Sequence, residues 1–111
     1  MLPKKERLSR VEFNRFFSVG KRYHAPSLQI IYAPYPTLHV SVVVSKKIAK
    51  SAVVRNKIRR RIYDIVRNYR SERAVSGVFI FMVKAPITTI QYSALKVEVI
   101  SAVQDVVRKF N

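Results

Sequence analysis

The order of hydrophobic patterns predicts a single α+β domain, an α–β sandwich with helices on a small mixed sheet. Three stretches carry apolar residues at helical spacing, two others have the composition or alternation of strands, and one is a continuous apolar run. In chain order they give α-β-β-α-β-α, with a short additional edge strand near residues 21–24. At 111 residues the chain forms one domain, 1–111, with a core of its own.

The N-terminal part begins with basic residues, and we expect a flexible arm over 1–7. The first helix begins after Ser9, because Ser9 and Glu12 have the spacing of a capping box. It ends at Gly20, which we expect in the left-handed conformation that often closes a helix.

The strands are predicted from composition and alternation. Residues 28–33 are β-branched and aromatic, and residues 38–44 alternate apolar and other side chains. Because only the turn 34–37 joins them, we expect an antiparallel pair. The apolar run 78–83 fits a strand buried on both faces, and residues 92–110 repeat apolar side chains at helical spacing.

The most strongly charged element is a helix capped by Ser51. The stretch 45–73 holds 11 of the chain's 22 Lys and Arg residues but only two acids. Its apolar residues form one stripe, Val54, Ile58, Ile62, Ile65, Val66 and Tyr69. The opposite side carries Asn56, Lys57, Arg60, Asp64 and Arg67, bordered by Arg59, Tyr63 and Arg70. A solvated face held by acid–base pairs is the alternative, but an Arg60–Asp64 pair would leave most of the charge unmatched.

The net charge of +16 predicts a polyanionic partner, a nucleic acid before a membrane surface. No apolar run reaches the ~18 residues of a membrane span, and no apolar segment follows the basic N-terminus as in a secretion signal. We therefore expect a cytoplasmic protein. His24 and His39 have no obvious carboxylate companion, cysteine is absent, and no Gly-rich phosphate loop exists. The sequence predicts a binding protein without catalytic residues.

One segment resembles a family signature. VSKKIAKSAVVRNKIRR is similar to the signature of the bacterial ribonuclease P protein subunit, an Arg-Asn-Arg-like run that opens a basic helix. Here the run is Arg55-Asn56-Lys57. Other matching positions extend over nearly the whole chain: Arg7, Leu8, Phe13, Phe17, Gly20, Tyr32 and Lys84-Ala85-Pro86.

The resemblance implies a fold and a role. It implies a left-handed crossover in which the basic helix joins two parallel strands. It also implies one protein per catalytic RNA, in a complex that removes the five-prime leader from precursor tRNA. The RNA carries out the phosphodiester hydrolysis and holds the required magnesium ions, and we expect no cofactor or metal on the protein.

Two sets of site residues follow from the resemblance. The residues expected to bind the catalytic RNA are Lys46, Lys47, Lys50, Arg55, Asn56, Lys57, Arg59, Arg60 and Arg67. The residues expected in a leader-binding cleft between the first helix and the sheet are Phe13, Phe17, Tyr32 and Lys84. Cations neutralise phosphates and aromatic faces stack bases, so both sets suit RNA. The alternative for the two phenylalanines is a core stripe.

Several residues differ from the family's common pattern, and two other functions are compatible with a basic helix. Lys57 replaces the usual second arginine, and Arg61, Tyr63 and Ser41 also differ from the family's common residues. A ribosomal or other structural-RNA protein would carry a similar helix. A helix-turn-helix DNA regulator would need a short helix just before the basic one, where this chain has a valine-rich strand.

Overall fold

The computed structural model describes residues 8–84 and 90–110. Its elements are α1 (Arg10–Val19), β1 (Lys21–His24), β2 (Leu28–Ala33), β3 (Leu38–Val43), α2 (Ala52–Glu72), β4 (Gly77–Val83) and α3 (Tyr92–Phe110). The predicted order is confirmed, and the edge strand near residues 21–24 is present as β1. The expected arm over 1–7 and the matching pair Ala85-Pro86 lie outside the described residues.

The four strands form one sheet in the order β1-β2-β4-β3. The expected pairing of 28–33 with 38–44 is wrong, because β4 lies between β2 and β3. β4 is antiparallel to β2 and parallel to β3. Six of its seven residues are buried. A strand with apolar side chains on both faces is most stable in the interior of a sheet. α2 connects the parallel strands β3 and β4; the left hand of that crossover stays a prediction.

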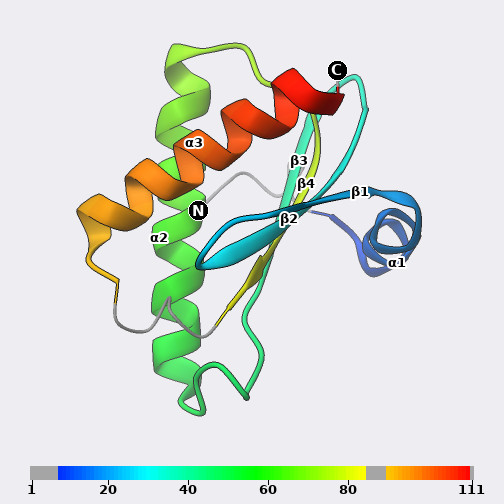
Figure 1. The fold of residues 1–111 in the computed structure, drawn as a ribbon. Helices are drawn as coiled ribbons and strands as arrows, with labels where there is room; N and C mark the ends of the chain where they lie inside the picture. Colours follow the sequence, from blue (N-terminus) through cyan, green and yellow to red (C-terminus); the bar gives the residue numbers. More distant parts are fainter. Residues whose placement is uncertain (1–7, 85–89, 111) are drawn as a thin grey trace.

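Helices cover both faces of the sheet. In Figure 1, α2 and α3 lie on one side and α1 on the other. Alternation along β2 sorts its side chains: Leu28, Ile30 and Tyr32 belong to the core beneath α2 and α3. Ile31 and Ala33 belong to a smaller cluster beneath α1. The two sides of the sheet therefore have separate cores.

α1 begins with the predicted capping box. The Ser9 Oγ accepts the Glu12 backbone N–H at 3.2 Å, and the Glu12 Oε1 accepts the Ser9 N–H at 3.2 Å. The Ser9 hydroxyl also donates to the Glu12 Oε1, at 3.0 Å. The two hydrogen bonds that the Ser9 backbone N–H and hydroxyl donate to this carboxylate lower the pKa of Glu12, with a smaller contribution from the nearby His39. Both bonds favour the charged carboxylate, which is also the form suited to the N-terminal end of a helix dipole.

The end of α1 differs from the prediction. Gly20 has φ −69° and ψ 156°, an extended conformation open to any residue. The reason for glycine is space instead: a Cβ there would lie 2.5 Å from the Ile31 Cγ2 and 2.8 Å from the Phe16 carbonyl oxygen. The absent side chain lets the helix end lie directly on β2.

Two carboxylates of α3 hold the β1–β2 hairpin. The Asp105 Oδ2 accepts the Tyr23 hydroxyl at 2.7 Å, and the Glu98 Oε2 accepts the Ser27 backbone N–H at 2.9 Å. The bond to Asp105 raises the pKa of Tyr23, because it stabilises the protonated phenol. Both acids thus have structural partners that fix the first two strands against α3.

Candidate nucleic-acid interface

α2 presents the predicted apolar stripe to the core, with two differences. Ser51 caps the helix through the Val54 backbone N–H, and the central residues of the stripe are buried. Val54 itself is 42% exposed, because the first turn lies beyond the packed part of the helix. Tyr63, expected at the border of the cationic side, is only 7% exposed. α2 packs against both β3 and α3, so its buried sector is wider than one stripe.

The opposite side of α2 is cationic and open. Lys57, Arg60 and Arg67 are exposed, as is Asn56. The Arg59 Nη1 donates to the Asn56 Oδ1 at 3.2 Å, which links two predicted contacts. A surface hollow of about 480 Å³ is lined by Asn56, Arg59, Arg60 and Tyr63. The structure therefore gathers three of the predicted RNA-binding residues, Asn56, Arg59 and Arg60, around one concave site.

Asp64 interrupts this cationic side with one negative charge. Its Oδ1 lies 3.5 Å from the Arg67 Nη2, and both side chains are nearly half exposed. Such exposed pairs contribute only ~0–1 kcal/mol and are screened by salt. The pair therefore does little to neutralise the face.

Arg55 connects α2 to the segment that precedes it. Its Nη1 donates to the carbonyl oxygens of Ala49 at 2.9 Å and Lys50 at 2.8 Å. Half-buried, it holds the 44–51 segment against the first turn of the helix. Lys46, Lys47 and Lys50 are exposed on that segment. Arg55 thus positions other predicted contacts, a role that no sequence pattern marks because its partners are backbone carbonyls.

On the other face of the sheet, α1 exposes part of an aromatic pair. The rings of Phe13 and Phe17 stack with centroids 5.7 Å apart and planes at 29°, and both residues are half-buried. The Arg22 guanidinium lies 5.1 Å from the Phe17 ring. Phe16 alone of the three phenylalanines is buried and anchors α1 on the sheet. Phe13 and Phe17 therefore combine a core contact with an accessible aromatic surface.

α1 covers only part of its side of the sheet. The strand register places Gln29, Met82 and Val43 in one row across β2, β4 and β3. All three are half-buried, whereas Ile31 and Ile80 in the next apolar row are buried. Val43 and Met82 pack against the same buried cluster as the aromatic pair, and we call this row the open half of the sheet. Sequence reasoning missed Arg22, Gln29 and Met82; strand alternation signals their face, but only the topology places them together.

Tyr32 does not belong to the predicted cleft. It is 1% exposed, and its ring lies 5.0 Å from Phe79 and 6.4 Å from Phe110 in the core beneath α2 and α3. Strand alternation places it opposite Ile31, which faces α1. Its assignment to the leader cleft is therefore wrong.

Lys84 lies at the end of β4, beside the β1–β2 turn. Its backbone N–H donates to the Ser27 carbonyl at 2.8 Å, and its ammonium donates to the Ala25 carbonyl at 2.9 Å. An ammonium can donate three hydrogen bonds, and this side chain is half-buried. Val83 pairs with Leu28, so Lys84 lies near the Gln29–Met82 end of the sheet.

The histidines form no catalytic pair in the part of the chain that the structure describes. The His39 Nε2 lies 2.9 Å from the Thr37 Oγ1, and the ring packs edge-on against Tyr35. His24 is exposed at the edge of the sheet. Across residues 8–84 and 90–110, no three His, Asp or Glu side chains gather as metal ligands would. No helix in these ranges is both long and apolar enough to cross a membrane.

A family model described as Ribonuclease P matches residues 2–107. The chain belongs to the ribonuclease P protein family. The "Ribonuclease P protein component" of a Synechococcus species is 30% identical over 106 residues, covering 89% of this chain and 80% of that protein. The protein of the same description from a Picosynechococcus species is 42% identical over 64 residues, 55% of either chain.

Solved structures agree with this family at the level of the fold. The Staphylococcus aureus RNase P protein superposes with a TM-score of 0.80, covering 96% of this chain and 98% of that one at 20% identity. The α+β sandwich is therefore the fold of a ribonuclease P protein.

Proposed function

We propose that this chain is the protein subunit of ribonuclease P. It binds the catalytic RNA through α2 and the 44–51 segment, and it binds the five-prime leader of precursor tRNA along α1 and the open half of the sheet. The observation that carries the proposal is the position of the family signature on the cationic side of α2, with an accessible aromatic pair on the opposite face of the sheet.

Binding to the catalytic RNA is mainly electrostatic. Lysines and arginines neutralise phosphates and release the counterions that had screened them. With about six phosphates neutralised, the logarithm of the binding constant should fall with a slope near −4 to −5 against the logarithm of salt concentration. Filter binding over a range of salt measures this slope. A slope flatter than about −2 would place the charge of α2 outside the interface.

The contact with the leader uses different chemistry. A single-stranded leader exposes base faces, which stack on aromatic rings without regard to sequence. Phe13 and Phe17 offer such rings, with Arg22 and Lys84 nearby for phosphates. The protein thereby holds the substrate next to the cleavage site without supplying a catalytic group.

The roles of the RNA and the protein are part of the same proposal. The RNA performs the hydrolysis with magnesium ions that it holds itself, and the protein raises the affinity for precursor tRNA. One protein assembles with one RNA in the cytoplasm. The rival function is a structural-RNA protein without a processing role.

Reconstitution separates these two functions. The protein is mixed with the catalytic RNA and precursor tRNA at low magnesium concentration, where phosphate repulsion is least screened. Leader removal should be faster than with the RNA alone. An unchanged rate, with RNA binding intact, would favour the structural-RNA function.

A further inference from the structure

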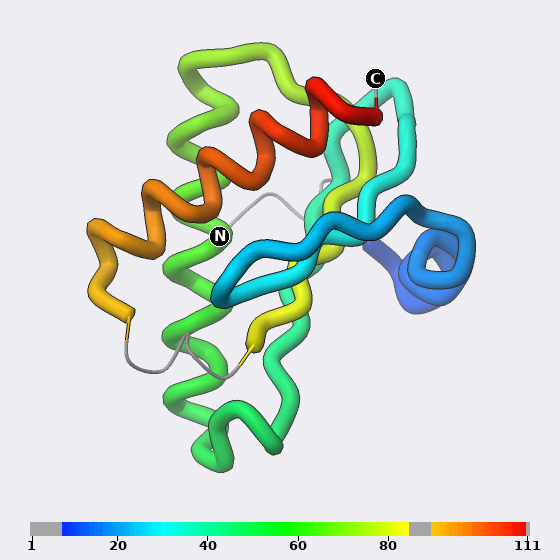
Figure 2. The backbone as a smooth tube through the Cα atoms, in the orientation of Figure 1, coloured from blue at the N-terminus to red at the C-terminus, as the bar shows by residue number. Residues whose placement is uncertain are grey.

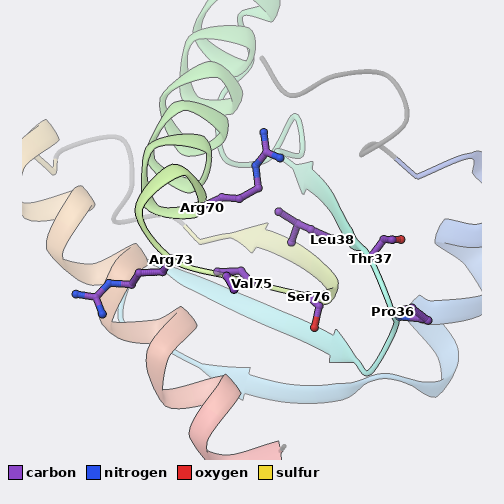
Figure 3. Close-up of a pocket in the computed structure, with 8 residues that line it drawn as sticks. Pro36, Thr37, Leu38, Arg70, Arg73, Val75 and Ser76 are labelled. Carbon is purple, nitrogen blue, oxygen red and sulfur yellow. The ribbon is translucent and has the colours of Figure 1, made fainter.

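A second hollow lies at the C-terminal end of α2, away from the family signature. It measures about 730 Å³ and lies between the end of α2, the start of β3 and the segment before β4 (Figure 3). Figure 2 shows that the segments before and after α2 are at opposite ends of the helix. Arg73 is about 27 Å from Arg55 along the helix at ~1.5 Å per residue. The hollow therefore lies at the other end of α2 from the signature.

The lining of this hollow is cationic with an apolar floor. Its charged residues are Arg70 and Arg73, and none of the described residues that line it is acidic. Leu38 is buried and Val75 half-buried, so their side chains supply the floor. Thr37 and Ser76 add exposed hydroxyls, and the Thr37 Oγ1 is 2.9 Å from the His39 Nε2. Positive walls over an apolar floor suit a phosphate attached to a sugar and a base.

The directions of the two arginines indicate what kind of anion fits. Figure 3 shows their side chains leaving the end of α2 in different directions. The Arg73 guanidinium lies 5.7 Å from the centre of the Tyr69 ring, and this cation–π contact favours its position beside Tyr69. Diverging guanidinium groups do not close on one phosphate ion, but they reach different phosphates of a strand. This arrangement suits a strand with several phosphates better than a single phosphate ion.

The hollow lies on the same side of α2 as the hollow at the signature. Asn56, Tyr63 and Arg70 are spaced seven residues apart and so lie along one side of the helix. The first two line the hollow at the signature, and Arg70 lines the second one. Only about 10 Å of helix separates Tyr63 from Arg70. An RNA strand can follow this side of α2 from one hollow to the other.

We propose that the hollow at the end of α2 binds a strand of the catalytic RNA. Arg70 and Arg73 contact its phosphates, and a sugar or base lies against Leu38 and Val75. The inference rests on the proposed function and extends the interface beyond the signature to the far end of the helix.

The absence of cysteine from the chain allows a direct test. Ser76→Cys is coupled to an iron chelate that generates hydroxyl radicals, and the protein is assembled with the catalytic RNA, with and without precursor tRNA. Discrete cuts in the catalytic RNA are expected. The matched control is Lys96→Cys, exposed on α3. Cutting no stronger than in the control, or confined to precursor tRNA, would overturn the inference.

Charge removal provides a second test. Arg70→Gln with Arg73→Gln should weaken binding to the catalytic RNA about tenfold and make the salt slope shallower by about 1 to 2. Lys96→Gln with Lys109→Gln removes the same charge from α3 and should keep the wild-type slope. Arg70→Lys with Arg73→Lys should restore most of the slope, and unfolding midpoints check that the variants fold.

The outcomes separate the inference from the function on which it rests. The double variant Arg70→Gln with Arg73→Gln is compared with the control Lys96→Gln with Lys109→Gln. Equal salt slopes for these two, with the wild-type protein binding normally, would overturn only the site at the end of α2. Failure of the wild-type protein to bind the catalytic RNA would overturn the proposed function and the site together.

Discussion

Arg55 is placed to serve the proposed RNA interface by positioning other residues. Its guanidinium is bound to two backbone carbonyls of the segment that carries Lys46, Lys47 and Lys50. Guanidinium presents donors in a rigid fork, whereas an ammonium is a point charge on a flexible stem. The geometry therefore depends on arginine itself and not only on positive charge.

Replacing Arg55 with lysine tests this positioning role. Arg55→Lys keeps the charge but loses the fork, so affinity for the catalytic RNA should fall nearly as far as in Arg55→Ala, about tenfold. The effect of Lys50→Ala should also be smaller in the Arg55→Ala background than in wild type, because the segment is already displaced. Filter binding of the four variants at fixed salt measures both effects. Wild-type affinity for Arg55→Lys would show that charge alone matters.

Glu12 makes the start of α1 sensitive to acid. Its hydrogen bonds with Ser9 lower its pKa below the ordinary value of 4.5, so the charged form is favoured by folding. The resulting stabilisation is present above the pKa of the unfolded chain and is lost as the pH falls through the folded pKa. Stability should therefore decrease on acidification in that window.

Glu12→Gln provides the control for this pH effect. Glutamine can accept the same Ser9 N–H but does not titrate. Urea midpoints measured across the acidic range should fall less steeply for Glu12→Gln than for wild type. Parallel curves for the two proteins would mean that Glu12 titrates alike in the folded and unfolded states.

At the scale of the element, α2 separates stability from binding on its two sides. Ile62 is fully buried, so Ile62→Ala should cost ~2–5 kcal/mol of unfolding free energy. Arg60 is exposed on the opposite side, so Arg60→Ala should change stability by less than ~0.5 kcal/mol. It should instead weaken RNA binding and flatten the salt slope by about 1. Urea unfolding and filter binding measure the two effects, and a large loss of stability in Arg60→Ala would contradict this division.

Most elements could be predicted because periodicity and capping are local properties. The Ser9–Glu12 capping box, the Ser51 cap and the six-residue run of β4 depend on nearby residues, and all three are present. The Gly20 prediction failed because the need for glycine came from a distant contact with Ile31. The local sequence shows where a glycine is, but it does not show which distant segment packs against it.

At the scale of the whole molecule, two predictions failed: which strands are neighbours, and which layer covers the face that carries Tyr32. Alternation groups Tyr32 with Leu28 and Ile30, but it does not say whether that group faces α1 or α2. The insertion of β4 between β2 and β3 likewise depends on long-range contacts, whereas the short turn between β2 and β3 suggested that these two strands pair directly. Errors at the predicted site come from this step. The exposed cationic residues of α2 lie together on one side because a single helix carries them all, and their role in RNA binding stays a prediction.

The two proposed RNA surfaces lie on opposite faces of one sheet, so we predict that their functions can be separated. Phe17→Ala with Lys84→Gln removes one aromatic face and one cation beside the open half of the sheet. Stacking contributes ~1–3 kcal/mol per base, so affinity of the holoenzyme for precursor tRNA should fall about tenfold or more. Mature tRNA has no leader and should bind equally well to mutant and wild type. Assembly with the catalytic RNA should also be unchanged, because α2 is intact.

Filter binding with labelled tRNAs at fixed salt measures these affinities, and Val19→Ala, exposed on α1, is the control. Because Phe17 also contacts the core beneath α1, the unfolding midpoint of the double variant is measured alongside. A loss confined to precursor tRNA places the leader on this face. Equal losses for precursor and mature tRNA would instead show that Phe17 and Lys84 support the fold or the assembly, since only the leader distinguishes the two ligands.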